Sequence, residues 1–187
     1  MIANDIKNIV KKAQQGDEAS FAILFDIFFD KIYRYINFRV NPNEVEDLVS
    51  EVFLRVVEKF NTYSEKKNAS FSAWIFKIAH NLVIDFYRKK KELLGLDDDL
   101  ENNEIFFMQN IEYEDLEDSV NKNLDTKKMY ELLKKLPAKY REILELKYLE
   151  GFSNKEISKI TNKSEGNIRL IQLRALREMR KIWPEGT

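Results

Sequence analysis

The stretch that decides the fold is FSAWIFKIAHNLVIDFYR, residues 71–88. Its apolar side chains recur at intervals of three and four residues, at Phe71, Trp74, Ile75, Ile78, Ala79, Leu82, Val83 and Phe86. This spacing predicts an amphipathic α-helix, which we extend over residues 71–91 with Ser70 or Ser72 as its N-cap. Such a helix buries its apolar stripe against other helices.

Two segments before this stretch supply partner helices. The first follows Asp17, a candidate N-cap, and has apolar residues at Phe21, Leu24, Phe25, Phe28, Ile32, Tyr35 and Ile36. The second spans residues 45–60, after a break at Asn41-Pro42-Asn43, and has apolar residues at Val45, Leu48, Val49, Val52, Phe53, Val56 and Val57. The polar segment 61–70 is predicted to be a loop. Three helices with matching stripes predict one shared hydrophobic core.

Residues 122–187 predict a second helical unit. A short helix covers 127–136, and Pro137 suits the first turn of the next helix, 138–150, which Gly151 ends. Residues 153–156 read as a capping box for a short helix through Ile160. After a turn at 161–163, Ser164 caps a last helix with apolar residues at Ile168, Ile171, Ala175, Leu176 and Met179. The pattern is typical of a helix-turn-helix motif, although a plain αα corner shares it.

The composition excludes several functional classes. The 187 residues include no Cys, five Gly, three Pro and a single His, His80. Without Cys there is no thiolate metal site, disulfide framework or Cys nucleophile. The sequence has neither a phosphate-binding P-loop nor the G-x-S-x-G turn of serine hydrolases. We therefore predict an all-α protein that is not an enzyme and uses no metal, cofactor or small-molecule substrate.

The sequence also predicts where the protein works. No run approaches the roughly 18 apolar residues of a membrane span, and the charged N-terminus lacks the apolar stretch of a signal peptide. We expect no membrane insertion and a cytoplasmic location.

Charge divides the chain into three blocks. Residues 92–121 hold eleven acidic residues and no Lys or Arg, although 31 basic and 32 acidic residues nearly balance over the whole chain. Like charges repel, so this block predicts a flexible acidic linker between domains at 1–91 and 122–187. A solvated tether is one interpretation, but its apolar run of residues 105–108 suggests that part of it docks.

Positive charge gathers on two of the predicted helices, over residues 77–91 and 163–181. Each carries four more basic than acidic residues. Basic helices favour a polyanionic partner, because neutralising phosphates releases counterions. A solvated helix face explains the same charges, so charge alone does not decide.

Specific motifs favour the polyanionic partner over the solvated helix face. VEDLVSEVF at residues 45–53, followed by residues 71–88, resembles region 2 of bacterial sigma factors of the extracytoplasmic-function type. LPAKYRE at residues 136–142, together with Gly151, residues 155–157 and the last basic helix, resembles region 4 of that family. The resemblance covers both helical units in the family's order. It implies a transcription initiation factor whose partners are core RNA polymerase and promoter DNA.

The resemblance assigns residues of region 2. The helix over residues 45–60 would bind core RNA polymerase through Glu46, Asp47, Leu48, Glu51, Val52 and Arg55. The following loop and helix would hold the unpaired non-template strand of the −10 element through Asn61, Tyr63, Ser64, Trp74, Lys77, His80, Asn81 and Arg88. Trp74 also lies on the apolar stripe, which favours a core role over base stacking. His80 stands where the family commonly has Arg.

The last helix would enter the major groove at the −35 element. Its DNA-facing residues, with one from the preceding helix, would be Lys155, Glu165, Asn167, Arg169, Leu170, Leu173 and Arg174. This choice places Ile168, Ile171 and Ala175 inward and Gln172 to the side. Leu170-Ile171 replace the Ser-Arg pair usual in this group, so the helix reads more like that of housekeeping sigma factors.

The linker and a regulator complete the prediction. By resemblance, the acidic linker would thread the positively charged path of the RNA in the polymerase. We expect no N-terminal autoinhibitory region and therefore a separate inhibitor, an anti-sigma factor. The rivals are an autonomous helix-turn-helix repressor or activator, and a helical adaptor.

Overall fold

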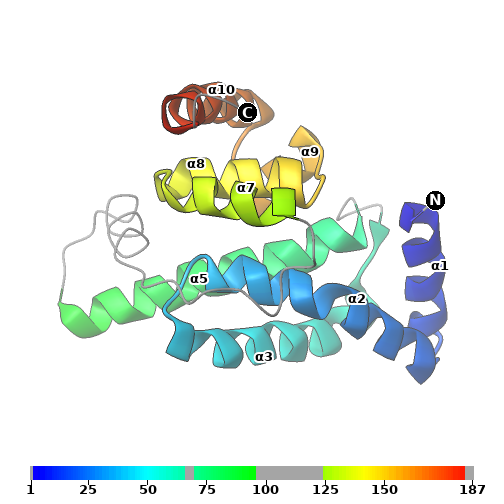
Figure 1. Cartoon of the computed structure of the whole chain (residues 1–187). Helices are drawn as coiled ribbons and strands as arrows, with labels where there is room; N and C mark the ends of the chain where they lie inside the picture. Colours follow the sequence, from blue (N-terminus) through cyan, green and yellow to red (C-terminus); the bar gives the residue numbers. More distant parts are fainter. Residues whose placement is uncertain (1, 66–69, 96–123, 184–187) are drawn as a thin grey trace. The chain divides into compact units, whose positions relative to one another are not determined.

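The computed structural model describes residues 2–65, 70–95 and 124–183, and its regular elements there are all helical (Figure 1). The chain divides into two compact units, Met1–Phe86 and Tyr87–Thr187. The all-α prediction with two helical domains is confirmed. None of the described helices is long and apolar enough to cross a membrane.

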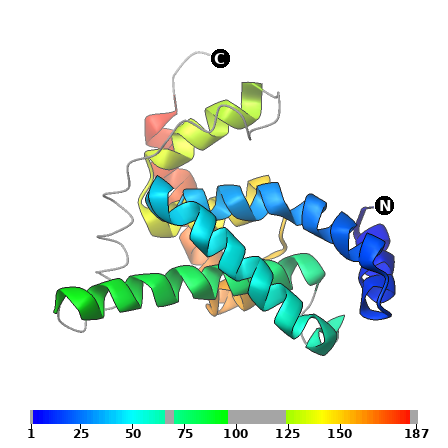
Figure 2. The same cartoon turned by 90° about the horizontal axis from the view of Figure 1, so that it is seen from below.

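Three helices form the core of the N-terminal unit, as the stripes predicted: α2 (Glu18–Asn37), α3 (Pro42–Lys59) and α5 (Phe71–Leu94). Figures 1 and 2 show α2 and α3 side by side and antiparallel. Phe21 near the start of α2 therefore meets Phe60 just after α3, with ring centroids 5.2 Å apart. Phe28 of α2 packs on Phe71 of α5 at 5.5 Å.

A fourth helix of this unit, α1 (Ile2–Gln14), was not predicted from the sequence. Val10 and Ala13 are its buried residues. Gln14 Nε2 donates hydrogen bonds of 3.1 Å to the carbonyl oxygens of Phe60 and Tyr63. The turn η1 (Phe60–Thr62) and the residue after it thus hold the end of α1. Figures 1 and 2 both place α1 at the end of the unit where α2 begins.

The helix ends of this unit agree with the sequence only in part. Ser70 Oγ accepts from the Ala73 N–H at 3.2 Å, which confirms Ser70 as a cap of α5. Asp17 occupies the N-cap position of α2 but its side chain makes no capping bond; it accepts from Ser20 Oγ instead. α5 ends at Leu94, beyond the predicted Lys91, and Gly95 follows it with a φ of 64°, the left-handed conformation that often ends a helix.

Over residues 124–183, the C-terminal unit consists of four α-helices and a π-helical turn: α7 (Leu124–Lys134), α8 (Ala138–Leu144), η2 (Glu145–Leu149), α9 (Asn154–Thr161) and α10 (Glu165–Ile182). One core cluster joins α7, α8 and α10 through Leu133, Leu136, Leu144, Ala175 and Met179. The predicted single helix over 138–150 was wrong in detail, since its second half widens into η2 before Gly151.

The turns around α9 match the sequence prediction. Ser153 and Glu156 form the predicted capping box, and Ser164 Oγ caps α10 by accepting from the Asn167 N–H at 3.2 Å. Asn162 has a φ of 55°, the left-handed conformation that ends α9 and starts the turn. Leu176 does not belong to the buried face as predicted, since 42% of its surface is exposed.

The first three residues of the predicted linker, residues 92–94, form the last turn of α5. Its remainder, residues 96–121 with the apolar run 105–108, lies outside the described residues. The domain limits at 91 and 122 therefore stay predictions.

Candidate nucleic-acid interface

The outer face of α3 carries most of the residues predicted to bind a partner. Glu46 and Asp47 are exposed, and Leu48 and Glu51 are half-buried. Val52 is 0% exposed, so its side chain lies in the core and not on the outer face of α3. It follows Glu51 in sequence, but one residue along a helix turns the side chain by about 100° toward the core.

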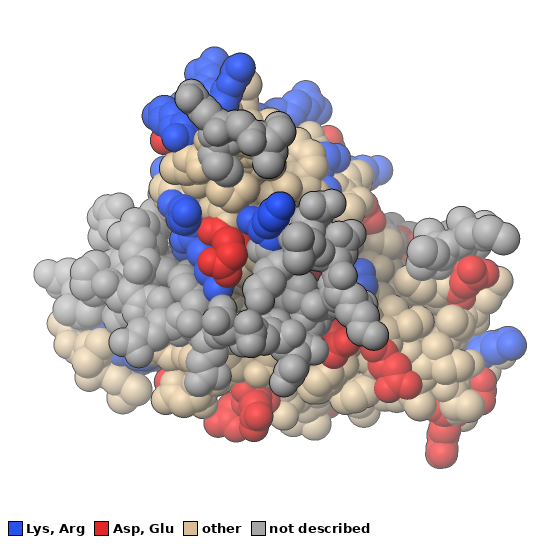
Figure 3. Space-filling view, in the orientation of Figure 1, with Lys and Arg blue, Asp and Glu red and all other residues tan. Residues whose placement is uncertain are grey.

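Three charged side chains link α3 to α5. Arg55 Nε donates to Glu51 Oε1 at 2.9 Å within α3, and Arg55 Nη1 lies 3.9 Å from Asp85 Oδ2 on α5. Acidic side chains gather along the lower edge of Figure 3, where α3 and the start of α2 lie in Figure 1. The face therefore presents carboxylates to a basic partner.

Apolar side chains extend this face in a way that the sequence analysis missed. Phe25, assigned to the core by its spacing, is 39% exposed and packs on Phe53 of α3 at 4.5 Å. Leu54 and Val57 are more than half exposed. The available signal was the width of the stripes, which hold more apolar positions than a three-helix core can cover.

Some of the predicted DNA-binding residues of α5 lie on the surface, and others are buried. Asn81 and Arg88 are exposed and Lys77 is half-buried. His80 is buried, with Nδ1 3.3 Å from the Tyr35 hydroxyl of α2. Trp74 is 8% exposed and packs on Tyr63 and Phe71, with ring centroids 5.1 and 5.3 Å away, which supports its core role.

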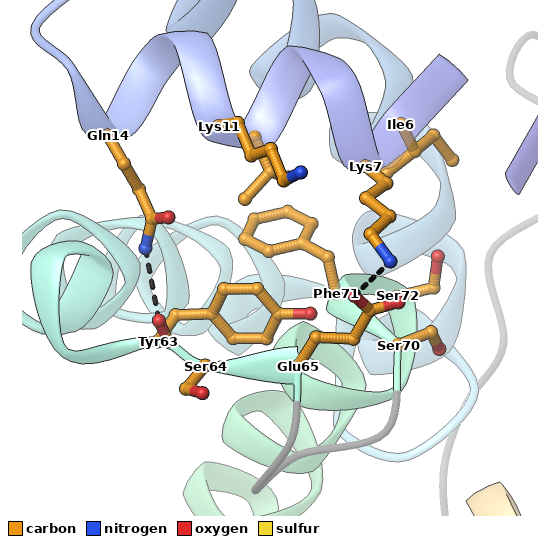
Figure 4. A pocket seen from close by; sticks show the side chains of 11 residues that line it. Ile6, Lys7, Lys11, Gln14, Tyr63, Ser64, Glu65, Ser70, Phe71 and Ser72 are labelled. Carbon is orange, nitrogen blue, oxygen red and sulfur yellow. Dashed lines mark hydrogen bonds and ion pairs between the residues drawn. The ribbon is translucent and has the colours of Figure 1, made fainter. Parts of the chain in front are cut away.

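A pocket of about 330 Å³ opens between α1, residues 63–65 and the start of α5 (Figure 4). Of the residues predicted in this loop, Tyr63 and Ser64 line it, whereas Asn61 is exposed and does not. Lys7 and Lys11 of α1 form another wall. The sequence analysis did not predict these lysines at the loop, because it did not predict α1, the helix that carries them.

Charge and burial define the chemistry of this pocket. Lys7 Nζ lies 2.6 Å from Glu65 Oε2, and both side chains are about half exposed. Burial, with a smaller contribution from the Glu65 carboxylate, raises the pKa of Tyr63 to about 12. At physiological pH the phenol is protonated, as an ordinary tyrosine is, and can donate a hydrogen bond.

The last helix has the rotation predicted from its spacing. Ile168, Ile171 and Ala175 are buried. The predicted DNA-facing residues are exposed, apart from a half-buried Glu165: Lys155, Asn167, Arg169, Leu170, Leu173 and Arg174. Arg169 Nη2 lies 3.7 Å from Glu165 Oε2. Lys and Arg side chains gather at the top of Figure 3, where α10 lies in Figure 1.

Within the described ranges, no group of three or more His, Cys, Asp or Glu side chains is placed to hold a metal ion.

Comparisons with known proteins match both units. Residues 24–92 match the family model of Sigma-70 region 2, and residues 126–179 match Sigma-70, region 4. The chain is 34% identical over 181 residues to the ECF RNA polymerase sigma factor SigW of Bacillus subtilis, across 94% of this chain and 95% of that protein. It is 32% identical over 178 residues to the ECF sigma factor BldN of Streptomyces coelicolor, and spans 65% of that longer relative.

Two solved structures share the fold. The sigma factor RpoE of Bartonella quintana, crystallised with the anti-sigma factor NepR, has a TM-score of 0.66 at 20% identity and covers 86% of this chain and 94% of its own. CnrH, in complex with the cytosolic domain of CnrY, has a TM-score of 0.60 at 17% identity and covers 93% of this chain and 94% of its own.

Proposed function

This chain belongs to the extracytoplasmic-function sigma factors of the sigma-70 family, and we propose how its surfaces divide the family's work. As a sigma factor, it binds core RNA polymerase and promoter DNA and directs promoter-specific transcription initiation; it is not an enzyme.

The α3 face binds core RNA polymerase. The exposed carboxylates of Glu46 and Asp47, with the Glu51–Arg55 pair, suit a basic helical surface, because complementary charge steers association and sets register. Leu48 and Leu54 add apolar area to the charged stripe. Val52 supports the face from inside.

The loop before α5 and the surface of α5 hold the unpaired strand of the −10 element. Exposed Asn81 and Arg88, with half-buried Lys77, offer an amide for a base edge and cations for phosphates. Tyr63 and Ser64 line a pocket at the same loop. Trp74 and His80 position these groups through their packing on Tyr63 and Tyr35.

α10 reads the −35 element, and the observation that carries this proposal is the segregation of its two faces. Its inner residues are buried, whereas Arg169, Leu170 and Leu173 point outward from the N-terminal half of the helix. Residues at the start of a recognition helix reach base edges in the major groove. Arginines suit phosphates, and an exposed leucine suits the methyl group of thymine.

An anti-sigma factor regulates the chain, and the work takes place in the cytoplasm. RpoE, which has the same fold, was crystallised with the anti-sigma factor NepR, and the structure of CnrH, also of this fold, is a complex with the cytosolic domain of CnrY. Both proposed partners, the polymerase and the promoter, are cytoplasmic in bacteria. The acidic linker occupies the RNA path of the polymerase until the transcript displaces it.

Run-off transcription tests the proposal. Core RNA polymerase with the purified chain should transcribe a subset of a genomic fragment library that core enzyme alone leaves silent. A gel shift with the chain alone separates the main rival, because an autonomous helix-turn-helix regulator holds duplex DNA tightly without polymerase. Tight binding by the free chain, combined with no added transcripts, would contradict the proposal.

A further inference from the structure

One side chain of α1 holds the backbone where it leaves α3. Gln14 is half-buried, and its Nε2 atom donates hydrogen bonds of 3.1 Å to the carbonyl oxygens of Phe60 and Tyr63. Both donors of the side-chain amide are used in this way, because an NH₂ group carries two hydrogens. Gln14 therefore joins α1 to the first residue of η1 and to the residue that follows η1.

The two carbonyl groups lie where the chain changes direction. α3 ends at Lys59, η1 adds one tight turn, and Tyr63 is extended, with a φ of −62° and a ψ of 134°. Carbonyl groups at the end of a helix lack partners within that helix. The Phe60 oxygen also accepts the Tyr63 N–H at 3.1 Å, so it takes part in both the turn and the bond from α1. Gln14 thus sets the direction in which the backbone leaves η1.

The residues directly after this bend are among those proposed above to hold the −10 strand. The Tyr63 ring packs on Phe71 and Trp74, with centroids 5.3 and 5.1 Å away, and Ser64 comes next in the chain. The start of α5 has a cap of its own, Ser70. Residues 60–65, in contrast, are held from α1.

A second link between α1 and this segment is weaker. Lys7 Nζ lies 2.6 Å from Glu65 Oε2, but both side chains are about half exposed, and exposed ion pairs contribute little to stability. The bonds of Gln14 are less exposed to water, so breaking them leaves carbonyl groups that water replaces less readily. Figure 4 shows both links reaching from α1. Gln14 is therefore the stronger of the two.

We propose that Gln14 is a positioning residue for promoter opening. It acts through the backbone of residues 60–65 and not by contact with DNA, and it keeps Tyr63 and Ser64 in place before the unpaired strand arrives. A segment that is ordered in advance loses less conformational freedom when the strand binds. The inference rests on the proposed function of this loop. It goes beyond that function by giving a part in opening to α1, a helix that the sequence resemblance did not include.

Four substitutions isolate the hydrogen bonds. Gln14→Leu removes both donors and changes the size of the side chain little. Gln14→Lys keeps donors at a similar reach, because an ammonium group has three N–H bonds. Gln15→Leu and Gln15→Lys are the matched controls, since Gln15 is the same residue type at the next position, is exposed and does not line the pocket. The lysine control also accounts for the added charge.

The kinetics of promoter opening test the proposal. Holoenzyme, formed from the full chain and core RNA polymerase, is mixed with duplex promoter, and permanganate footprints over time give the rate constant of opening. Gln14→Leu should lower this rate constant by about tenfold, as expected for the loss of one or two hydrogen bonds. Gel shifts in the cold, where the duplex stays closed, should show initial capture close to that of wild type. Gln14→Lys should open the promoter about as fast as Gln15→Lys.

A purely structural role of Gln14 gives a different result. Lower stability reduces the fraction of active holoenzyme, and with it the amplitude, but leaves the rate constant of each active complex unchanged. Urea unfolding of the same variants shows the conditions under which every chain is folded. Trp74 reports on the segment itself, because it packs on Tyr63 and is the only tryptophan in a Trp183→Phe background. Gln14→Leu should make the Trp74 fluorescence easier to quench with acrylamide.

The outcomes separate this inference from the proposed function. The inference fails if Gln14→Leu opens the promoter as fast as Gln15→Leu, if Gln14→Lys is as slow as Gln14→Leu, or if opening slows while the quenching of Trp74 stays unchanged. Asn81→Ala, at the proposed strand site, is measured alongside. Slow opening by Asn81→Ala would then leave the proposed function standing, whereas normal opening by both Asn81→Ala and Gln14→Leu would overturn both.

Discussion

Gln172 of α10 is joined to Asn154 of α9: Gln172 Nε2 donates to Asn154 Oδ1 at 3.1 Å. Both residues are half-buried, and they lie 18 positions apart. Asn154 is the first residue of α9, directly after the N-cap Ser153, so this bond connects the start of one helix to the side of the other. It is a side-chain link between the two helices of the helix-turn-helix.

The first prediction concerns this bond. Gln172→Ala should destabilise the chain by about 1 kcal/mol, the usual contribution of one such hydrogen bond. It should also lower transcription from promoters with a −35 element more than from a premelted −10 template, because only α10 is released. Urea unfolding and run-off assays measure the two effects. An equal loss on both templates would mean that the bond does not act through α10.

The second prediction concerns polymerase binding by α3. Asp47→Lys together with Glu51→Lys should weaken capture of core RNA polymerase in a pull-down while circular dichroism stays unchanged. Asp47→Lys is the cleaner single change, because Glu51→Lys also places a second cation beside Arg55. Asp5→Lys, an exposed reversal on α1, is the control. Unchanged capture by the double variant would remove this face from the interface.

The third prediction concerns Asn81, which is exposed on α5. Asn81→Ala should impair promoter opening more than initial capture, because its amide suits an unpaired base, and a single base contact contributes about 1–3 kcal/mol. Permanganate footprints report opening and gel shifts report capture. If Asn81 reads a base, a premelted template should not restore full activity. Footprints equal to those of wild type would exclude Asn81 from opening.

The fourth prediction separates phosphate contacts from base contacts on α10. Arg169→Ala and Arg174→Ala should weaken holoenzyme binding about equally across −35 variants and lower the salt slope by about one unit each. Leu170→Ala should leave the slope alone and flatten the preference at one −35 position. Leu170 is 45% exposed, so thermal melting should stay near that of wild type. A large drop in Tm for Leu170→Ala would place it in the core instead.

The fifth prediction concerns pH and Tyr63. The folded chain holds the Tyr63 proton up to a pKa of about 12, whereas an unfolded tyrosine releases it near pH 10. The contribution to stability is therefore complete below pH 10 and is lost as the pH rises toward 12. Between pH 9.5 and 11.5, Tyr63→Phe should lose stability less steeply than wild type in urea unfolding. Tyr148→Phe, at an exposed position, is the control, and parallel curves for wild type and Tyr63→Phe would contradict the prediction.

The local sequence pattern was sufficient to predict much of the structure of this protein. The spacing of Ile168, Ile171 and Ala175 determined the rotation of α10, because neighbours three and four apart share a helix face whatever the rest of the chain does. Ser153 and Glu156 determined the start of α9 for the same reason, since a capping box closes within four residues. The two family motifs determined the order of the domains.

Only the tertiary structure decided which apolar side chains are buried and which polar side chains contact one another. Phe25, Val57 and Leu176 have core-like spacing yet stay exposed, because burial depends on how many helices lie alongside and not on period. The pocket depends on Gln14 reaching carbonyls 46 and 49 positions away, and on Lys7 reaching Glu65. Contacts at that separation leave no trace in a local pattern, so only the packed chain places α1 beside the loop before α5.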